Sequence, residues 1–251
     1  MKVCFVCHLP NLTGANRSLL DMIDGLDNSI VTPFVLLNGH GPIESELKKR
    51  KIKYKIVFYS PATNSDNKVK NLIKWVLNTA PANFISVNLI KKVLIEEKVE
   101  LVHNNTFIVG AAMQAAKELS IPYICHIREF IWEDHHRKFF HPQRQQCLLE
   151  NATKVLAITD SIKAKFQPIC PKEITAIYDG VDVNEYLLPV RRVLENKNIS
   201  ILMTGRIAPG KGQLDSIKAV EKLFNEGYKN LSLKIVGGIG DEEYYRELKK
   251  Y

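Results

Sequence analysis

The chain has 251 residues, of which 45% are hydrophobic and 25% are charged, with a formal net charge of +8. This is the composition of a globular chain with enough apolar material for a core. The longest apolar runs, such as Val3–Cys7, are far shorter than the roughly 20 residues that a membrane-spanning helix needs. The basic balance suits nucleic acids, anionic membranes or phosphorylated small molecules. Nucleic acid is disfavoured, because no binding motif and no interleaved aromatic residues accompany the basic residues.

The opening run Val3–Cys7 predicts a first β-strand rather than a signal peptide, because its apolar core is short and Pro10 follows it closely. Cys4 and Cys7 form a Cys-x-x-Cys pattern, but residues three apart in a strand point to opposite faces. We therefore favour core packing over a redox or metal role. Five cysteines, an odd number lying mostly in apolar segments, indicate free thiols and a reducing, cytoplasmic location.

Short β-rich runs alternate with longer helical patterns, which is typical of a parallel sheet covered by helices. The predicted strands of the first part are Lys2–Cys7, Pro33–Leu37, Tyr54–Phe58, Leu101–His103, Tyr123–Ile127, Val155–Thr159 and Thr175–Tyr178. The predicted helices between them are Ala15–Leu26, Ile43–Lys51, Lys68–Asn78, Ile85–Glu97, Phe107–Leu119 and Pro142–Asn151. The fold class is therefore α/β, with a Rossmann-like sheet.

The pattern restarts after a polar, charged stretch. We predict an N-terminal domain over residues 1–190, a linker over 191–198 and the start of a second Rossmann-like domain over 199–251. The elements predicted for this second part are strands Ile199–Met203 and Leu231–Val236 and helices Gly212–Glu226 and Glu242–Tyr251. A complete domain of this type needs on the order of 100–150 residues, so we expect the second domain to be incomplete.

The strongest chemical signal lies between the first strand and the first helix of this second part. Arg206 follows the strand, and Lys211 comes just before the helix. Glycines at a strand end let the backbone approach a ligand, and two cations there match a diphosphate. The alternative is a solvent-exposed loop with two ordinary basic residues. A P-loop is disfavoured, because Gly212 stands where its metal-binding hydroxyl belongs.

Five motifs in order resemble glycosyltransferase family 4, whose retaining enzymes have the two-domain GT-B fold. In chain order they are Thr13–Leu19, then Ile121–His126, then Leu156–Ser161, then Tyr178–Asp182, and last Gly205–Gln213 together with Leu233–Gly237. The resemblance spans essentially the whole chain. The sequence departs from the family at Thr13 and Asn16, where a second glycine and an acidic residue are frequent, and at Asp179, where asparagine is usual.

The resemblance implies transfer of a sugar from a nucleotide-sugar to a saccharide or lipid-linked acceptor, with no metal and no further cofactor. Arg206 and Lys211 match the residues that grip the donor diphosphate, and Gly14 matches the loop glycine that approaches it from the first domain. His126 matches the active-site histidine near the sugar; the alternative is a strand-end histidine bonded to backbone carbonyls. Arg128, Glu129 and Asn16 are further candidates for lining the same cleft.

The family's Glu-x7-Glu pair, whose second glutamate holds the donor ribose, is not found among the 251 residues. We therefore expect this chain alone to have little or no transfer activity. The alternative is a non-catalytic fragment, or a partner of a separately encoded remainder. A nucleotide-sugar epimerase or a dehydrogenase is a third hypothesis; no Gly-x-Gly-x-x-Gly follows the first strand, which disfavours the dehydrogenase.

Two further clusters have weaker signals. Glu133–His136 with His141 resembles a metal cluster, but its spacing fits no standard ligand set, so a solvated or acceptor-facing segment is favoured. The second is a basic helix with an apolar face, formed by the set Lys68, Val69, Lys70, Leu72, Ile73, Lys74, Trp75, Val76 and Leu77, with Lys91 and Lys92 nearby. Such a helix suits peripheral contact with an anionic membrane. The alternative is a helix packed on the sheet with its lysines in solvent.

Overall fold

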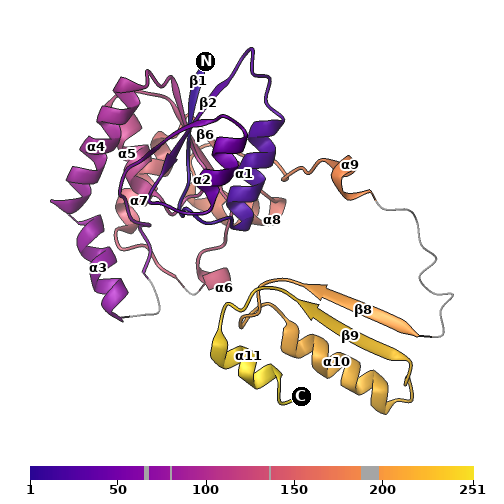
Figure 1. Ribbon diagram of the computed structural model, residues 1–251. Helices are drawn as coiled ribbons and strands as arrows, with labels where there is room; N and C mark the ends of the chain where they lie inside the picture. The colour runs from indigo at the N-terminus through magenta and orange to yellow at the C-terminus, as the bar shows by residue number, and fades with distance from the viewer. Residues whose placement is uncertain (65–67, 80, 136, 188–197) are drawn as a thin grey trace. The chain divides into compact units, whose positions relative to one another are not determined.

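The computed structural model describes residues 1–64, 68–79, 81–135, 137–187 and 198–251 (Figure 1). The chain divides into two compact units, residues 1–183 and 184–251. The predicted boundary was at residue 190. Of the predicted linker 191–198, only Asn198 is among the described residues.

The first unit is built on one parallel sheet. Its strands are β1 (Lys2–Val6), β2 (Thr32–Leu37), β3 (Lys53–Ile56), β4 (Leu101–Asn104), β5 (Tyr123–Ile127), β6 (Lys154–Ala157) and β7 (Ile174–Ala176). Its longer helices are α1 (Gly14–Asp24), α2 (Ile43–Lys49), α3 (Lys68–Asn78), α4 (Ala82–Glu96), α5 (Gly110–Glu118), α7 (Pro142–Asn151) and α8 (Asp160–Phe166). Short turns of helix are α6 (Trp132–His135), η1 (Gln167–Ile169) and α9 (Val183–Tyr186).

The strand order β3-β2-β1-β4-β5-β6-β7 is that of a Rossmann-like sheet. The registers pair Val3 with Pro33 on one side of β1 and with Leu101 of β4 on the other. The chain winds outward in both directions from β1 and β4. In such sheets ligands bind beyond the carboxyl ends of the strands where the order reverses, which here is the edge after β1 and β4.

Helices cover both faces of the sheet (Figure 1). One face packs against α4, α5, α7 and α8 and buries Cys4 and Val6 of β1. The other packs against α1 and α2 and buries Val3, Phe5 and Cys7. The two cysteines therefore lie on opposite faces, which confirms that they do not pair. Both thiols are free, and burial raises the pKa of Cys7 to about 12, so it stays protonated at neutral pH.

The second unit has strands β8 (Ile199–Thr204) and β9 (Leu231–Val236), which are parallel, and helices α10 (Gln213–Asn225) and α11 (Glu242–Leu248). Both strands alternate between half-buried and exposed residues. One face of this small sheet leaves apolar side chains in solvent, among them Leu202 and Val236. The αβ pattern predicted for this part is confirmed.

Candidate functional site

The loop between β1 and α1 is held from inside by Asn16. This side chain is fully buried, and its amide nitrogen donates to the carbonyls of Leu9 and Asn11, each at 2.7 Å. Asn16 therefore shapes the loop rather than presenting its amide to solvent. Gly14 begins α1, and a Cβ added there would meet no atom within 4 Å. The space beside this helix start is open, as a loop that admits a ligand requires.

His126 lies at the carboxyl end of β5, 3% exposed. Neither ring nitrogen has a hydrogen-bond partner among the described residues, so the predicted alternative of a histidine bonded to backbone carbonyls is wrong. Its ring centroid is 5.5 Å from that of His103 on β4. Burial, and then the nearby Arg128 guanidinium, lower the pKa of His126 to about 3 and that of His103 to about 4. Both imidazoles are therefore neutral at physiological pH.

Arg128, which follows β5, is hydrogen-bonded to residues after β4 and β7 and to helix α1, which follows β1. Its guanidinium donates to Asn105 Oδ1 at 3.0 Å, to Ser18 Oγ at 3.0 Å and to both carboxylate oxygens of Asp179 at 2.8 and 2.7 Å. Asn105 in turn donates to the carbonyl of Ala15 at 3.0 Å. Although partial burial opposes it, hydrogen bonds from Ser18 and Arg128 lower the pKa of Asp179. This network connects the segments that follow the strands at the carboxyl edge of the sheet, where the strand order reverses between β1 and β4.

The two members of this ion pair differ in burial, which predicts unequal effects of removing them. The Arg128 side chain is 4% exposed and that of Asp179 is 38% exposed. Asp179→Ala leaves a buried guanidinium without its counter-ion and should lower the free energy of unfolding by about 3 kcal/mol. Arg128→Met should cost less, because the Asp179 carboxylate regains water. Urea unfolding followed by circular dichroism measures both losses.

The matched control is Lys165→Met, which removes the pair between Lys165 and Glu133, two side chains that are 42% and 47% exposed. An exposed pair is worth less than about 1 kcal/mol. If Asp179→Ala costs no more than this control, the Arg128 network does not stabilise the edge of the sheet.

In the second unit, Arg206 and Lys211 lie in the turn between β8 and α10, as predicted. Both are exposed, and neither makes an ion pair with any described residue. The buried Gln213 donates its side-chain amide to the carbonyl of Arg206 at 3.0 Å, which fixes the backbone at the strand end. Gly210 and Gly212 have φ of 78° and 77°, a left-handed conformation that disfavours side chains. Gly212 caps α10, so Lys211 stands just before the helix N-terminus.

The turn after β9 packs tightly against Arg206. A Cβ on Gly237 would lie 1.8 Å from the carbonyl oxygen of Gly205, and one on Gly240 would lie 2.7 Å from Arg206 Cδ. Only glycine fits at both places without a shift. The Arg206 stem therefore rests on glycine backbone while its guanidinium remains accessible to solvent.

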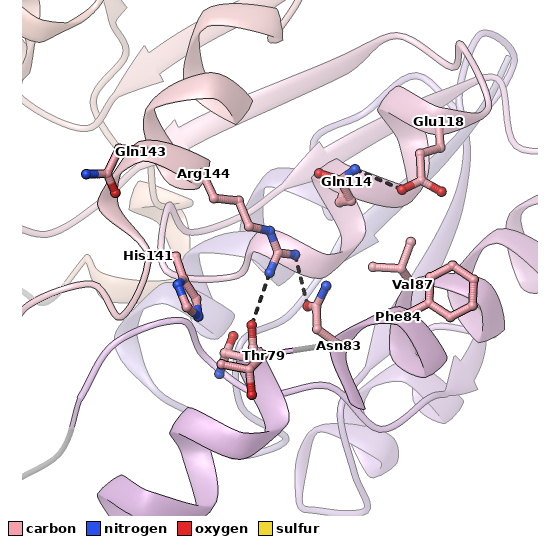
Figure 2. Close-up of a pocket in the computed structure, with 10 residues that line it drawn as sticks. Thr79, Asn83, Phe84, Val87, Gln114, Glu118, His141, Gln143 and Arg144 are labelled. Carbon is pink, nitrogen blue, oxygen red and sulfur yellow. Dashed lines mark hydrogen bonds between the residues drawn. The ribbon is translucent and has the colours of Figure 1, made fainter. Parts of the chain in front are cut away.

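Among the residues that the structure describes, no group of three His, Cys, Asp or Glu residues could bind a metal, and this includes the described members of the cluster predicted as metal-like. His136 lies outside the described residues, Glu133 pairs with Lys165, and His141 lines a different hollow. That hollow is a pocket of about 590 Å³ between the α3–α4 corner, α5 and the start of α7 (Figure 2). None of the residues predicted for the sugar-transfer site lines it.

The hydrogen-bond partners of Arg128 and the position of His103 beside His126 were not predicted from the sequence. Asp179 was visible as a departure from the family's asparagine, and an unexplained arginine two residues after His126 was the complementary signal. Asn105 follows a buried strand at the switch point, where polar residues are informative. Glu129, the remaining candidate, is half-buried beside Arg128.

The seven-stranded parallel sheet of the first unit and the parallel strands and helices of the second give this chain an α/β fold of the GT-B type. The chain aligns with the structure of HepE from Anabaena in complex with UDP and glucose at 20% identity and a TM-score of 0.71, covering 100% of this chain and 65% of that one. It aligns with the lipopolysaccharide outer core galactosyltransferase WaaB at 21% identity and a TM-score of 0.60, covering 99% of this chain and 65% of WaaB. MurG from Acinetobacter baumannii aligns at 15% identity and a TM-score of 0.54, over 98% of this chain and 71% of MurG.

The model of Glycosyltransferase Family 4 matches residues 12–185, more than half of the chain. The chain belongs to this family. No curated protein sequence matches it. It spans about two thirds of the length of HepE and WaaB.

Proposed function

We propose that this chain takes part in transferring a sugar from a nucleoside-diphosphate sugar, with retention of configuration, to a saccharide or lipid-linked acceptor. The observation that supports the proposal most is the turn after β8 of this chain, which belongs to Glycosyltransferase Family 4. There two exposed cations, Arg206 and Lys211, flank a glycine-rich strand end and a helix N-terminus. Such a turn suits a diphosphate, because fixed cations and free backbone N–H groups meet at one place.

The first unit supplies two further groups to this proposal. The backbone N–H groups of Gly14 and Ala15, at the start of α1, have no partner among the described residues, and the space beside Gly14 is open. His126 holds two unpartnered nitrogens at the end of β5. A buried polar group without a partner costs free energy, and a sugar hydroxyl would supply the partner. Because its imidazole is neutral, His126 would hydrogen-bond to the sugar and orient it, and it would not balance the charge of the diphosphate.

The chemistry we propose is stabilisation of the departing nucleoside diphosphate. Negative charge develops on that group as the bond to the sugar breaks, and a guanidinium and an ammonium beside it would lower the energy of this state. Under this proposal no metal and no further cofactor is needed, because the cations of the protein supply the charge. A cytoplasmic location fits a nucleotide-sugar substrate and free thiols. Contact with an anionic membrane is a separate proposal, since it rests on a different surface.

The family's Glu-x7-Glu pair has no counterpart in these 251 residues. We therefore propose that the chain alone binds nucleoside diphosphate but turns over little donor. The measurement is release of UDP from UDP-glucose, with UDP chosen because HepE and MnaA from Staphylococcus aureus were solved with it. Turnover close to background is expected, with or without EDTA.

Robust turnover by the 251-residue chain that is lost in His126→Ala would show that this chain is catalytic by itself. Absence of any nucleoside-diphosphate binding would instead favour a non-catalytic partner subunit. If turnover occurs, NMR of the product gives its anomeric configuration, and inversion would contradict the retaining mechanism.

A further inference from the structure

Helix α3 presents its apolar face to solvent. Its side chains Val69, Leu72, Ile73, Trp75 and Val76 are between 47% and 68% exposed. At 100° per residue these five positions form one stripe along the helix. The alternative that this helix packs its apolar face on the sheet with the lysines in solvent is therefore wrong.

The inward edge of α3 is polar, and hydrogen bonds hold it there. Asn78 is the buried residue of this helix. Its amide donates to the carbonyl of Pro61 at 3.0 Å. Arg144 of α7 donates to the carbonyl of Asn78 at 3.3 Å and to Asn83 Oδ1 at 2.9 Å, which fastens the α3–α4 corner (Figure 2). The outward direction of the apolar stripe is thus set by specific polar contacts.

Apolar exposure continues on the next helix. Phe84, Ile85 and Leu89 of α4 are 61%, 57% and 48% exposed, and α3 and α4 are in contact. We call these three residues, with the five exposed apolar residues of α3, the α3–α4 face. Scattered exposed apolar residues are normal on a soluble protein, but eight on two consecutive helices mark an interaction surface.

The charge around this face indicates what covers it. Residues 68–94 contain five lysines and no aspartate or glutamate. Lys68 and Lys70 on α3 are exposed, whereas Lys92 on α4 is exposed but lies 3.9 Å from Glu96 of the same helix. On α3 itself a tryptophan, aliphatic side chains and lysines occur without acidic residues, a composition that suits the boundary between anionic headgroups and acyl chains.

We propose that the α3–α4 face docks this protein on an anionic lipid bilayer, with the apolar side chains in the acyl boundary and the lysines against the headgroups. None of the helices that the structure describes is long and apolar enough to cross a membrane, so the contact would be interfacial. The proposal is independent of the proposed sugar transfer, because it uses none of those residues.

The test is co-sedimentation of the 251-residue chain with vesicles of phosphatidylcholine containing 25% phosphatidylglycerol, and with vesicles of phosphatidylcholine alone. Binding to the anionic vesicles that falls at high salt is expected, because surface attraction is screened. Lys68→Gln and Lys70→Gln should each weaken it about fivefold, the equivalent of about 1 kcal/mol per lysine. The double change Leu72→Glu with Val76→Glu should weaken it at least about tenfold.

Ile30→Glu is the matched control, since Ile30 is 62% exposed and lies outside this face; it should change binding less than about twofold. The chain has two tryptophans, so Trp132→Phe leaves Trp75 as the single reporter, and its emission should shift to the blue on binding. The proposal is overturned by equal binding to neutral vesicles, by an unshifted Trp75 emission, or by no binding at all. It is also overturned if the chain is a dimer in sedimentation measurements without lipid and the double change Leu72→Glu with Val76→Glu converts that dimer to a monomer.

Discussion

Replacing Arg206 by alanine should weaken binding of UDP to this chain by about 1.5–3 kcal/mol, which is the loss of one charge-assisted hydrogen-bonding group. Lys211→Ala should have an effect of the same order. Binding of uridine should change much less in both variants, because it carries no phosphate. Arg206→Lys should restore part of the loss, since an ammonium cannot supply the planar fork of a guanidinium. Isothermal titration calorimetry with both ligands measures these differences.

Lys222→Ala is the matched control, because Lys222 is an exposed cation in the last turn of α10, at the other end of the helix from Lys211. Its removal should leave UDP binding unchanged apart from a small screened contribution. If it weakens binding as much as Arg206→Ala does, UDP responds to net charge and not to the turn after β8. The assignment of the donor site would then fail.

The sheet could be predicted from the sequence because both of its faces are covered. A strand buried on two sides is a nearly continuous apolar run, as in Tyr123–Ile127, which is interrupted only by His126 and whose predicted bounds are those of β5. Helix bounds were also predictable where proline marks them, as at Pro142 of α7. The short helix α8 (Asp160–Phe166, 7 residues) was not predicted, because about two turns of helix carry little periodicity.

The direction of α3 could not be predicted for a different reason. Periodicity tells which residues share a face of a helix, but not whether that face meets the protein or the solvent. The deciding contacts come from far along the chain, from Pro61 and Arg144. Their pairing with Asn78 is visible only once the fold is assembled.

The same limit applies to the candidate site. The motifs indicated Gly14, His126, Arg206 and Lys211 as candidates. The structure places Gly14 at the start of α1, His126 near the end of β5, and Arg206 and Lys211 in the turn between β8 and α10. The Arg128 pair with Asp179 joins residues 51 positions apart, and the packing of His126 against His103 joins two strands. Contacts between strand ends depend on the strand order, which local sequence does not contain.

Acidification should destabilise the first unit steeply below pH 6.5. An unfolded histidine titrates near pH 6.5, whereas burial lowers the pKa of His103 to about 4 and of His126 to about 3. Between these values the unfolded chain binds two protons that the folded chain does not. The free energy of unfolding should therefore have its maximal value above pH 6.5. It should fall by up to about 2.7 kcal/mol per pH unit as the pH drops toward 4. Urea unfolding at half-unit steps from pH 7.5 to 4.5 measures this slope.

Each histidine should contribute about half of that slope, so His103→Gln should reduce it by about half between pH 6 and 4.5. Its control is His40→Gln, because the His40 side chain is 84% exposed and loses little water on folding. Carboxylates such as Asp179, whose pKa is lowered, add to the loss only at more acidic pH, since an unfolded aspartate titrates near pH 3.9. The histidine effect is therefore separable in the range from pH 6.5 to 5. A flat free energy of unfolding across that range would mean that His103 and His126 take up protons in the folded chain. The role proposed above for His126, that of a neutral hydrogen-bonding group, would then fail.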